Sequence, residues 1–299
     1  MSETQEAVLP PKVDLPSLEK NAFEWRSLKN GILTGLIWVV GILASVPLFS
    51  VIYMLLVEGG ARLDLEAITA LPPAGLEMGG GFGNAIVGTL VMVGIAAAIS
   101  IPVGVLAAIY LSILNPSCKL ATTSRFLAKV LTGFPSILAG VFVYAVLVVT
   151  SGTYSAWAGG IALAVLMLPT VTLAAEEAMK QVPQKMKDAA FGMGCTRTQV
   201  IFKVVLPTGL PGILTGVILA VAGAAGESAP LLFTALFSNY FMAELAEPTA
   251  SLSILIYNFS GMPFDNQIEL AWAASLVLVL LVLFFNILAR IIGRAKFKE

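Results

Sequence analysis

Glu227 has the most unusual position of any ionisable residue in the chain, because it lies deep within a long apolar segment. Such a group is costly in a hydrocarbon environment and usually faces a bundle interior or a polar path. The ring of Pro230 clashes with the carbonyl of Gly226, so we predict a break in the helix there. We expect the path to be lined or gated near this break by Glu227, Ser228 and Thr234. A purely structural, protonated glutamate is the alternative.

Enzymatic chemistry is poorly supported by the remaining residues. The chain has no histidine, which excludes a Ser-His-Asp triad, an H-E-x-x-H zinc site and His-ligated haem. No Asp pair lies within an apolar segment, which argues against an aspartyl protease. Cys118 and Cys195 are too few for a metal cluster or a disulfide framework. We therefore expect no catalytic residue, no metal site and no enzymatic activity in this chain.

Composition indicates an integral membrane protein built from helices. The chain is 58% hydrophobic and 12% charged, whereas soluble domains carry about 25% charged residues. The net charge of −1 and the lack of a basic tract give no sign of nucleic-acid binding. We predict an all-α polytopic protein with six transmembrane helices, each meeting the requirement of about 20 apolar residues. They are Ile32–Val57, Asn84–Leu111, Val130–Thr150, Ala156–Ala175, Leu210–Phe237 and Leu270–Ile292.

The charges between these segments predict their orientation in the membrane. If the segments alternate, every basic residue except Arg62 falls on one side, so both termini are expected to be cytoplasmic. The predicted organisation is a cytoplasmic tail at 1–29, a six-helix transmembrane domain at 30–295 and a cytoplasmic tail at 296–299. The opposite side carries eight carboxylates, which either dock a soluble partner or merely avoid the inner face: Glu58, Asp64, Glu66, Glu77, Glu244, Glu247, Asp265 and Glu269.

A charged loop at about 176–208 is the most ordered polar stretch in the apolar part of the chain. Pro183 is expected to open a short helix, and Gly192 and Gly194 to form a turn. Thr196 and Gln199 have capping-box spacing, which predicts a second helix ending at Leu206–Pro207. The first helix carries a small apolar stripe formed by Met186, Ala189, Ala190 and Met193. The pattern fits either a helix–turn–helix that seats in a partner's groove or an ordinary amphipathic surface loop.

The spacing within this loop resembles the "EAA" loop of bacterial ABC importer permeases. The matching positions are Ala189, Ala190, Gly194, Leu206 and Pro207, with Asp188 in place of the usual Glu and Val204 in place of Ile. In that family the loop forms coupling helices that dock onto nucleotide-binding subunits. The resemblance therefore implies the MetI-like permease fold and assigns contact with an ATPase to Asp188, Ala189, Ala190, Gly194, Leu206 and Pro207.

Further stretches resemble the PstA-type phosphate permeases within that family. They are 83–89, 133–137, 176–178 and 226–235, and the likeness extends from about residue 80 to the end. It implies a PstC-like second permease, two PstB-like ATPases that use ATP and Mg, and an extracytoplasmic PstS-like phosphate-binding protein. It also implies location in the lipid of the bacterial inner membrane. Ser136 and Asn258 are further candidates for the path, although an asparagine near a loop more often stabilises a turn.

Two positions depart from the family pattern, since arginines common in the family are Leu173 and Gly223 here. Either a partner chain supplies the cationic groups or the substrate is not phosphate. The favoured function is ATP-driven phosphate import by alternating access. The alternatives are a permease for sulfate, molybdate or another small polar solute, a phosphate-signalling subunit without flux, and an independent channel.

Overall fold

The computed structural model describes residues 25–295, and every regular element in that range is a helix. This confirms the expected all-α class. The chain divides into two compact units, Met1–Tyr53 and Met54–Glu299, which are described separately. The described part of the first unit belongs to the helix α1 (Trp25–Met54), so helix already covers the end of the predicted 1–29 tail. The rest of that tail, and the tail at 296–299, lie outside the described residues.

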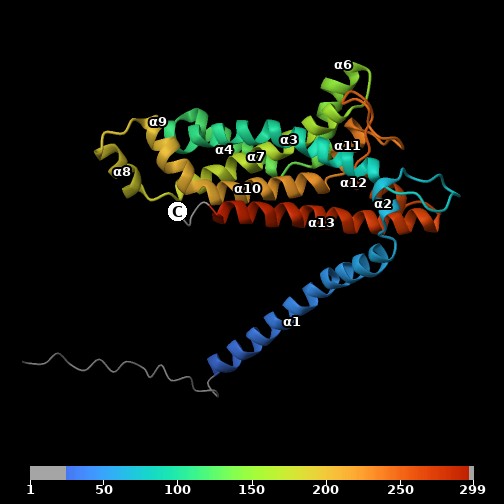
Figure 1. Cartoon of the computed structure of the whole chain (residues 1–299). Coiled ribbons are helices and arrows are strands. Elements are labelled where there is room, and N and C mark those ends of the chain that lie inside the picture. The colour runs from blue at the N-terminus through green and yellow to red at the C-terminus, as the bar shows by residue number, and fades with distance from the viewer. Residues whose placement is uncertain (1–24, 296–299) are drawn as a thin grey trace, which may run out of the picture. The chain divides into compact units, whose positions relative to one another are not determined.

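The second unit is a helical bundle (Figure 1). Its elements, in chain order, are η1 (Leu55–Gly59), α2 (Leu65–Thr69), α3 (Gly83–Ile109), η2 (Tyr110–Leu114), α4 (Lys119–Thr132), α5 (Ser136–Val143), η3 (Tyr144–Val148), α6 (Val149–Ser151), α7 (Ala156–Lys180), α8 (Gln184–Gly192), α9 (Arg197–Val200), η4 (Ile201–Val205), α10 (Leu206–Gly226), α11 (Ala229–Thr234), α12 (Leu252–Ser260) and α13 (Asp265–Ala295). The η elements are single π-helical turns. We call the two ends of this bundle the α8 end and the α2 end.

Within residues 25–295, five helices are long and apolar enough to cross a membrane, or six if one bent pair is counted as a span. The bent pair is Lys119–Thr132 with Ser136–Ser151, which meet at 105°. Counted as one span, the pair runs from Lys119 to Ser151, whereas the prediction was Val130–Thr150. Most of α4 lies outside the predicted segment because this helix is amphipathic, and its charged face lowers the mean hydropathy that identifies a span. The fifth segment also differs, since it ends at Gly226 instead of Phe237.

Helix α7 is the centre of the bundle. In the most apolar 18-residue stretch of α7, 61% of residues are buried. The corresponding stretches of the spans that contain α3, α10 and α13 each have 28% buried. It packs against α3, α4, α5, α10 and α11. Leu163 and Met167 of α7 are fully buried together with Met92 of α3. Any element that positions a functional residue in this unit therefore does so largely through α7.

Helices α7 and α10 meet through small residues. A Cβ atom added to Gly216 would lie 2.2 Å from the Cβ of Ala174, and one added to Gly212 would lie 2.7 Å from that of Ala178. This arrangement matches the close backbone approach that small residues allow between membrane helices. The glycines of α10 do not all serve packing, because Gly223 and Gly226 have no neighbouring heavy atom within 4 Å of such a Cβ.

The loop before α3 is pinned by its own carboxylates. Asp64 caps α2 by accepting from the backbone N–H of Ala67 at 2.7 Å, and Glu66 accepts from the N–H of Gly80 at 2.9 Å. Glu77 accepts from the N–H of Ala74 at 2.9 Å. Three of the eight carboxylates predicted on this side therefore stabilise the loop, which favours a local role over partner docking for these three.

Gly216→Ala should destabilise the bundle by about 1–3 kcal/mol, because the new methyl group overpacks the contact with Ala174. The matched control is Gly94→Ala in α3, where a Cβ meets nothing within 4 Å and helix propensity improves. Unfolding of both purified variants in mixed micelles with increasing denaturing detergent would measure the difference. Equal midpoints for the two variants would contradict the packing argument.

Candidate functional site

The predicted helix break at Pro230 is present. Helix α10 ends at Gly226, the backbone of Glu227 is extended with ψ of 122°, and α11 begins at Ala229 with Pro230 in its first turn. Proline lacks an N–H and excludes the carbonyl four residues earlier, so an unbroken helix cannot pass this point. The half-buried Glu227 side chain is therefore held on a short non-helical connection and not on a helix face.

Helix α12 supports this break. The Ser253 hydroxyl donates to the carbonyl of Glu227 at 3.0 Å, and its oxygen lies 3.1 Å from the hydroxyl oxygen of Ser251. Ser251 caps α12, and the N–H of Leu252 donates to the hydroxyl of Thr89 on α3 at 2.8 Å. A backbone carbonyl freed by a break cannot be satisfied by lipid, so these internal donors keep the break stable within the bundle.

A cavity of about 190 Å³ lies beside the break. It is lined by residues from α4, α5, α7, α10 and the connections next to them, namely Leu131, Thr132, Phe134, Ser136, Leu166, Met167, Thr170, Leu219, Ala220, Gly223, Ala224 and Glu227. Thr170 lies ten residues before the end of α7, which corresponds to about 15 Å from the α8 end of that helix. The cavity therefore lies beside the middle part of α7.

The polar groups of the cavity are three hydroxyls and one carboxylate. Ser136 and Thr170 offer hydroxyl donors, and Glu227 offers an acceptor. The hydroxyl of Thr132 already donates to the carbonyl of Lys129 at 2.8 Å, so its oxygen is left as an acceptor. This combination is suited to a small polar solute that both accepts and donates hydrogen bonds. Thr132 and Thr170 were missed from the sequence because a single threonine near a helix end carries no local signal of its surroundings.

The other predicted path residues lie outside this lining. Ser228 follows Glu227 directly and is half-buried. Thr234 is fully buried, and its hydroxyl donates to the carbonyl of Pro230 at 2.8 Å, so it stabilises α11. Asn258 is half-buried on α12. The cavity thus brings together Ser136 and Glu227 of the predicted set.

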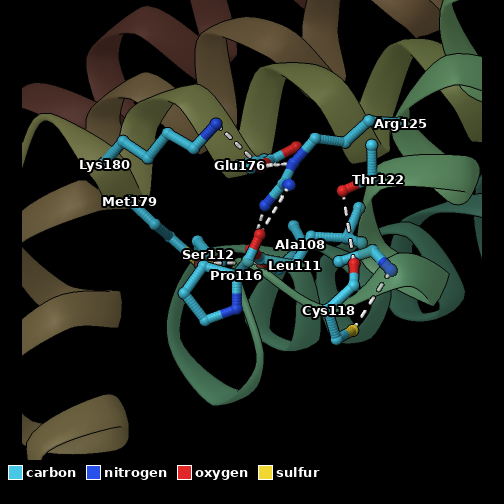
Figure 2. A network of polar contacts seen from close by, with 11 residues as sticks. Ala108, Leu111, Ser112, Pro116, Cys118, Thr122, Arg125, Glu176, Met179 and Lys180 are labelled. Atoms are coloured by element: carbon cyan, nitrogen blue, oxygen red, sulfur yellow. Dashed lines mark hydrogen bonds and ion pairs between the residues drawn. The ribbon is translucent and has the colours of Figure 1, made fainter.

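A buried ion-pair cluster at the α8 end was also missed (Figure 2). Glu176 of α7 is 2% exposed, and its Oε1 lies 2.5 Å from Arg125 Nε of α4 and 2.8 Å from Lys180 Nζ. The remaining guanidinium nitrogens of Arg125 donate to the carbonyl of Pro116 at 2.7 Å and to that of Leu111. One arginine of α4 therefore joins η2 and the connection that follows it to α7.

The charged loop forms the short helix α8, as expected, and a second helix begins at Arg197. Gly194 has the positive φ of a turn, at 83°. The Thr196–Gln199 capping box is complete, with distances of 2.8 and 3.3 Å. On α8 only Ala190 is buried, in a cluster that includes Met179 of α7.

One expectation about this loop is wrong, because Leu206–Pro207 does not end the second helix. The helix continues from Arg197 to Gly226 as a single span. The π-turn η4 directly precedes α10, and Pro207 falls in the first turn of α10, where its missing N–H disrupts little.

Arg125→Met should destabilise the bundle by about 3–5 kcal/mol, since it leaves the buried Glu176 carboxylate without its main partner. The double change Arg125→Met with Glu176→Gln should recover part of this loss. Lys180→Met is the matched control, because that side chain is 45% exposed and should cost about 1 kcal/mol or less. Detergent-denaturation midpoints would rank the three variants, and an equal loss for Arg125→Met and Lys180→Met would contradict the assignment.

Ser253→Ala should loosen the break by removing the donor to the Glu227 carbonyl. A lost neutral hydrogen bond of about 1 kcal/mol corresponds to roughly fivefold faster hydrogen exchange at the first amides of α11. Ser260→Ala is the control, because Ser260 is exposed on the same helix and donates only to Tyr257. Unchanged exchange at 229–232 in Ser253→Ala would contradict the supporting role.

Comparison with known proteins places this geometry in a family. Residues 100–298 match the family described as "Binding-protein-dependent transport system inner membrane component". The chain is 37% identical over 274 residues to "Phosphate transport system permease protein PstA" of Haemophilus influenzae, covering 92% of this chain and 97% of that protein. It is 38% identical over 281 residues to the protein of that name from Yersinia pestis, covering 91% and 92%.

Solved structures agree with the fold. The bacterial alginate ABC transporter in complex with an alginate pentasaccharide-bound periplasmic protein matches with a TM-score of 0.66 at 15% identity, covering 92% of this chain and 99% of that chain. An inward-facing MetNI methionine ABC transporter matches with a TM-score of 0.57 at 21% identity, covering 73% and 95%. These likenesses confirm the expected ABC importer permease fold. The chain is therefore a multi-pass membrane protein that belongs to the binding-protein-dependent transport system inner membrane components, and among them to the PstA-type permeases.

Proposed function

We propose that this chain is the permease subunit of an ATP-driven importer of inorganic phosphate. The observation that carries the proposal is the alignment of more than nine-tenths of the chain with relatives named as phosphate permeases. The polar cavity along the middle part of α7, beside a helix break, supports it, because discontinuous helices commonly form substrate sites near the bilayer midplane.

The cavity chemistry favours phosphate over the other oxyanions. The hydroxyls of Ser136 and Thr170 donate to phosphate oxygens. Glu227 accepts from a protonated phosphate oxygen, which sulfate lacks at neutral pH. Since a carboxylate repels an anion that offers no proton, Glu227 disfavours fully ionised solutes at the same position. The break at Gly226 and Pro230, supported by Ser253, holds Glu227 in place, and Ser228 beside it is a further candidate for the path.

Force enters at α8. Its Ala190 packs on the end of α7, while Phe191 and Met193 are 45% and 79% exposed and free to meet another protein. ATP-driven closure of two partner ATPases, which bind the ATP and Mg, pushes on Asp188–Gly194. Helix α7 passes from this contact to the cavity, so the push reaches Met167 and Thr170. The path then opens alternately to the two sides.

The assembly comprises a second PstC-like permease, two PstB-like ATPases and a PstS-like binding protein outside the membrane. In this arrangement the α8 end and both termini are cytoplasmic. Leu219 in the cavity lining is 67% exposed, and this apolar side of the cavity faces the second permease. That chain completes the enclosure of the phosphate.

The reconstituted complex should hydrolyse ATP faster when the binding protein carries phosphate and should accumulate phosphate inside the vesicles. Stimulation by sulfate or molybdate but not by phosphate would refute the substrate. Phosphate flux without any ATPase subunit would instead support a channel.

Glu227→Gln should lower phosphate uptake at least tenfold, because the amide loses the charge that selects a protonated oxyanion. Complex assembly should be unchanged, and the control Glu244→Gln on the connection between α11 and α12 should transport normally. Intact uptake with altered phosphate-responsive signalling would favour a sensor role over a path role.

A further inference from the structure

We propose that Lys129 supplies this chain's positive charge for the transported anion, at the edge of the cavity nearer the α8 end. The inference rests on the proposed function, and Lys129 is not one of the predicted path residues. Sequence reasoning had placed Lys129 in a loop before the third span. The structure instead places it in the last turn of α4, within the bent pair that packs on α7.

Two contacts fix the level of Lys129 along the bundle. Arg125 of α4 pairs with Glu176 of α7, and Thr132 of α4 lines the cavity together with Thr170 of α7. The helices therefore run antiparallel, and Lys129 lies between these two levels. It is three residues before Thr132, which is about 4.5 Å along the helix.

Lys129 also lies on the appropriate side of α4. Arg125, Lys129 and Thr132 follow the spacing i, i+4 and i+7, so they form one stripe along the helix. The first member of the stripe reaches α7 and the last reaches the cavity. The Lys129 side chain is exposed, and its flexible stem allows the ammonium to extend toward the cavity opening.

The charge of Lys129 is available to an anion. In residues 25–295 its ammonium forms no ion pair, whereas Arg125 and Lys180 are both engaged by Glu176. The sequence has no basic residue between 130 and 175 or between 206 and 226, the stretches that supply the rest of the cavity lining. Lys119 is ten residues earlier on α4, about 15 Å farther from the cavity. Lys129 is thus the free cation that the described residues place nearest to the cavity.

An isolated cation at a helix end has a simpler explanation, since a lysine in the last turn also complements the helix dipole. That role contributes to stability and does not depend on an anion. The two explanations are separated by measuring transport and assembly together and by restoring the charge chemically.

The experiment uses the complete reconstituted complex with phosphate-loaded binding protein. Lys129→Met should reduce the maximal rate of phosphate uptake at least tenfold, while Lys129→Arg should retain most of it. Lys119→Met is the matched control on the same helix and should transport at the wild-type rate. Uptake by Lys129→Met within twofold of wild type would overturn the inference. If the wild-type complex itself takes up no phosphate, the proposed function is wrong, and this inference is wrong as well because it rests on that function.

A second variant keeps the test decisive if Lys129→Met assembles poorly. Lys129→Cys is made in a background with Cys195→Ala and Cys118→Ser, in which the serine oxygen replaces the sulfur that caps α4. Reaction with 2-aminoethyl methanethiosulfonate restores an ammonium group at position 129. Methyl methanethiosulfonate forms the same kind of disulfide bond but adds only a neutral methylthio group. Uptake should rise severalfold with the first reagent only. An equal response to both reagents would show a packing role and overturn the proposal.

Discussion

Backbone groups in the apolar layer of a membrane must be satisfied within the protein, and this constraint governs where the bundle can be irregular. Two breaks occur in its spans, one at Gly133–Pro135 and the other at Gly226–Ser228. The helices that follow these breaks pack on each other, since a Cβ on Gly140 of α5 would lie 2.6 Å from the Cα of Pro230 of α11. The cavity forms where the two irregular connections meet. Its position thus follows from the same constraint as the fold.

The sequence predicts features whose causes are local. Pro230 breaks a helix wherever it is placed, and Thr196 with Gln199 caps a helix through residues only three apart. The helical class, the approximate spans and the break beside Glu227 could therefore be derived in advance. The π-turn before Pro207 could not, because proline is an equally good signal for the end of a helix and for its first turn.

Features that depend on contacts between residues far apart in the chain could not be predicted from the sequence. Ser253 supports Glu227 from 26 residues away, and Arg125 meets Glu176 across 51 residues. Neither pair has a pattern in the sequence that links its members. The charged face of α4 also lowers the mean hydropathy of this helix, which packs along α7. The sequence therefore places Arg125 and Lys129 in a loop. The candidate site was thus half predicted, with Glu227 and Ser136 found and Thr132, Thr170 and their supports missed.

The contact between α7 and α10 differs in kind from the contacts at the α8 end. Arg125 of α4 joins η2, the connection before α4, and α7 through two carbonyls and an ion pair, so these elements resist separation. At the Ala174–Gly216 contact, by contrast, the two backbones approach closely because neither residue has a long side chain. This contact thus depends on close fit and not on charge. Since Thr170 of α7 and Gly223 of α10 both line the cavity, a shift between these two helices would change the shape of the cavity.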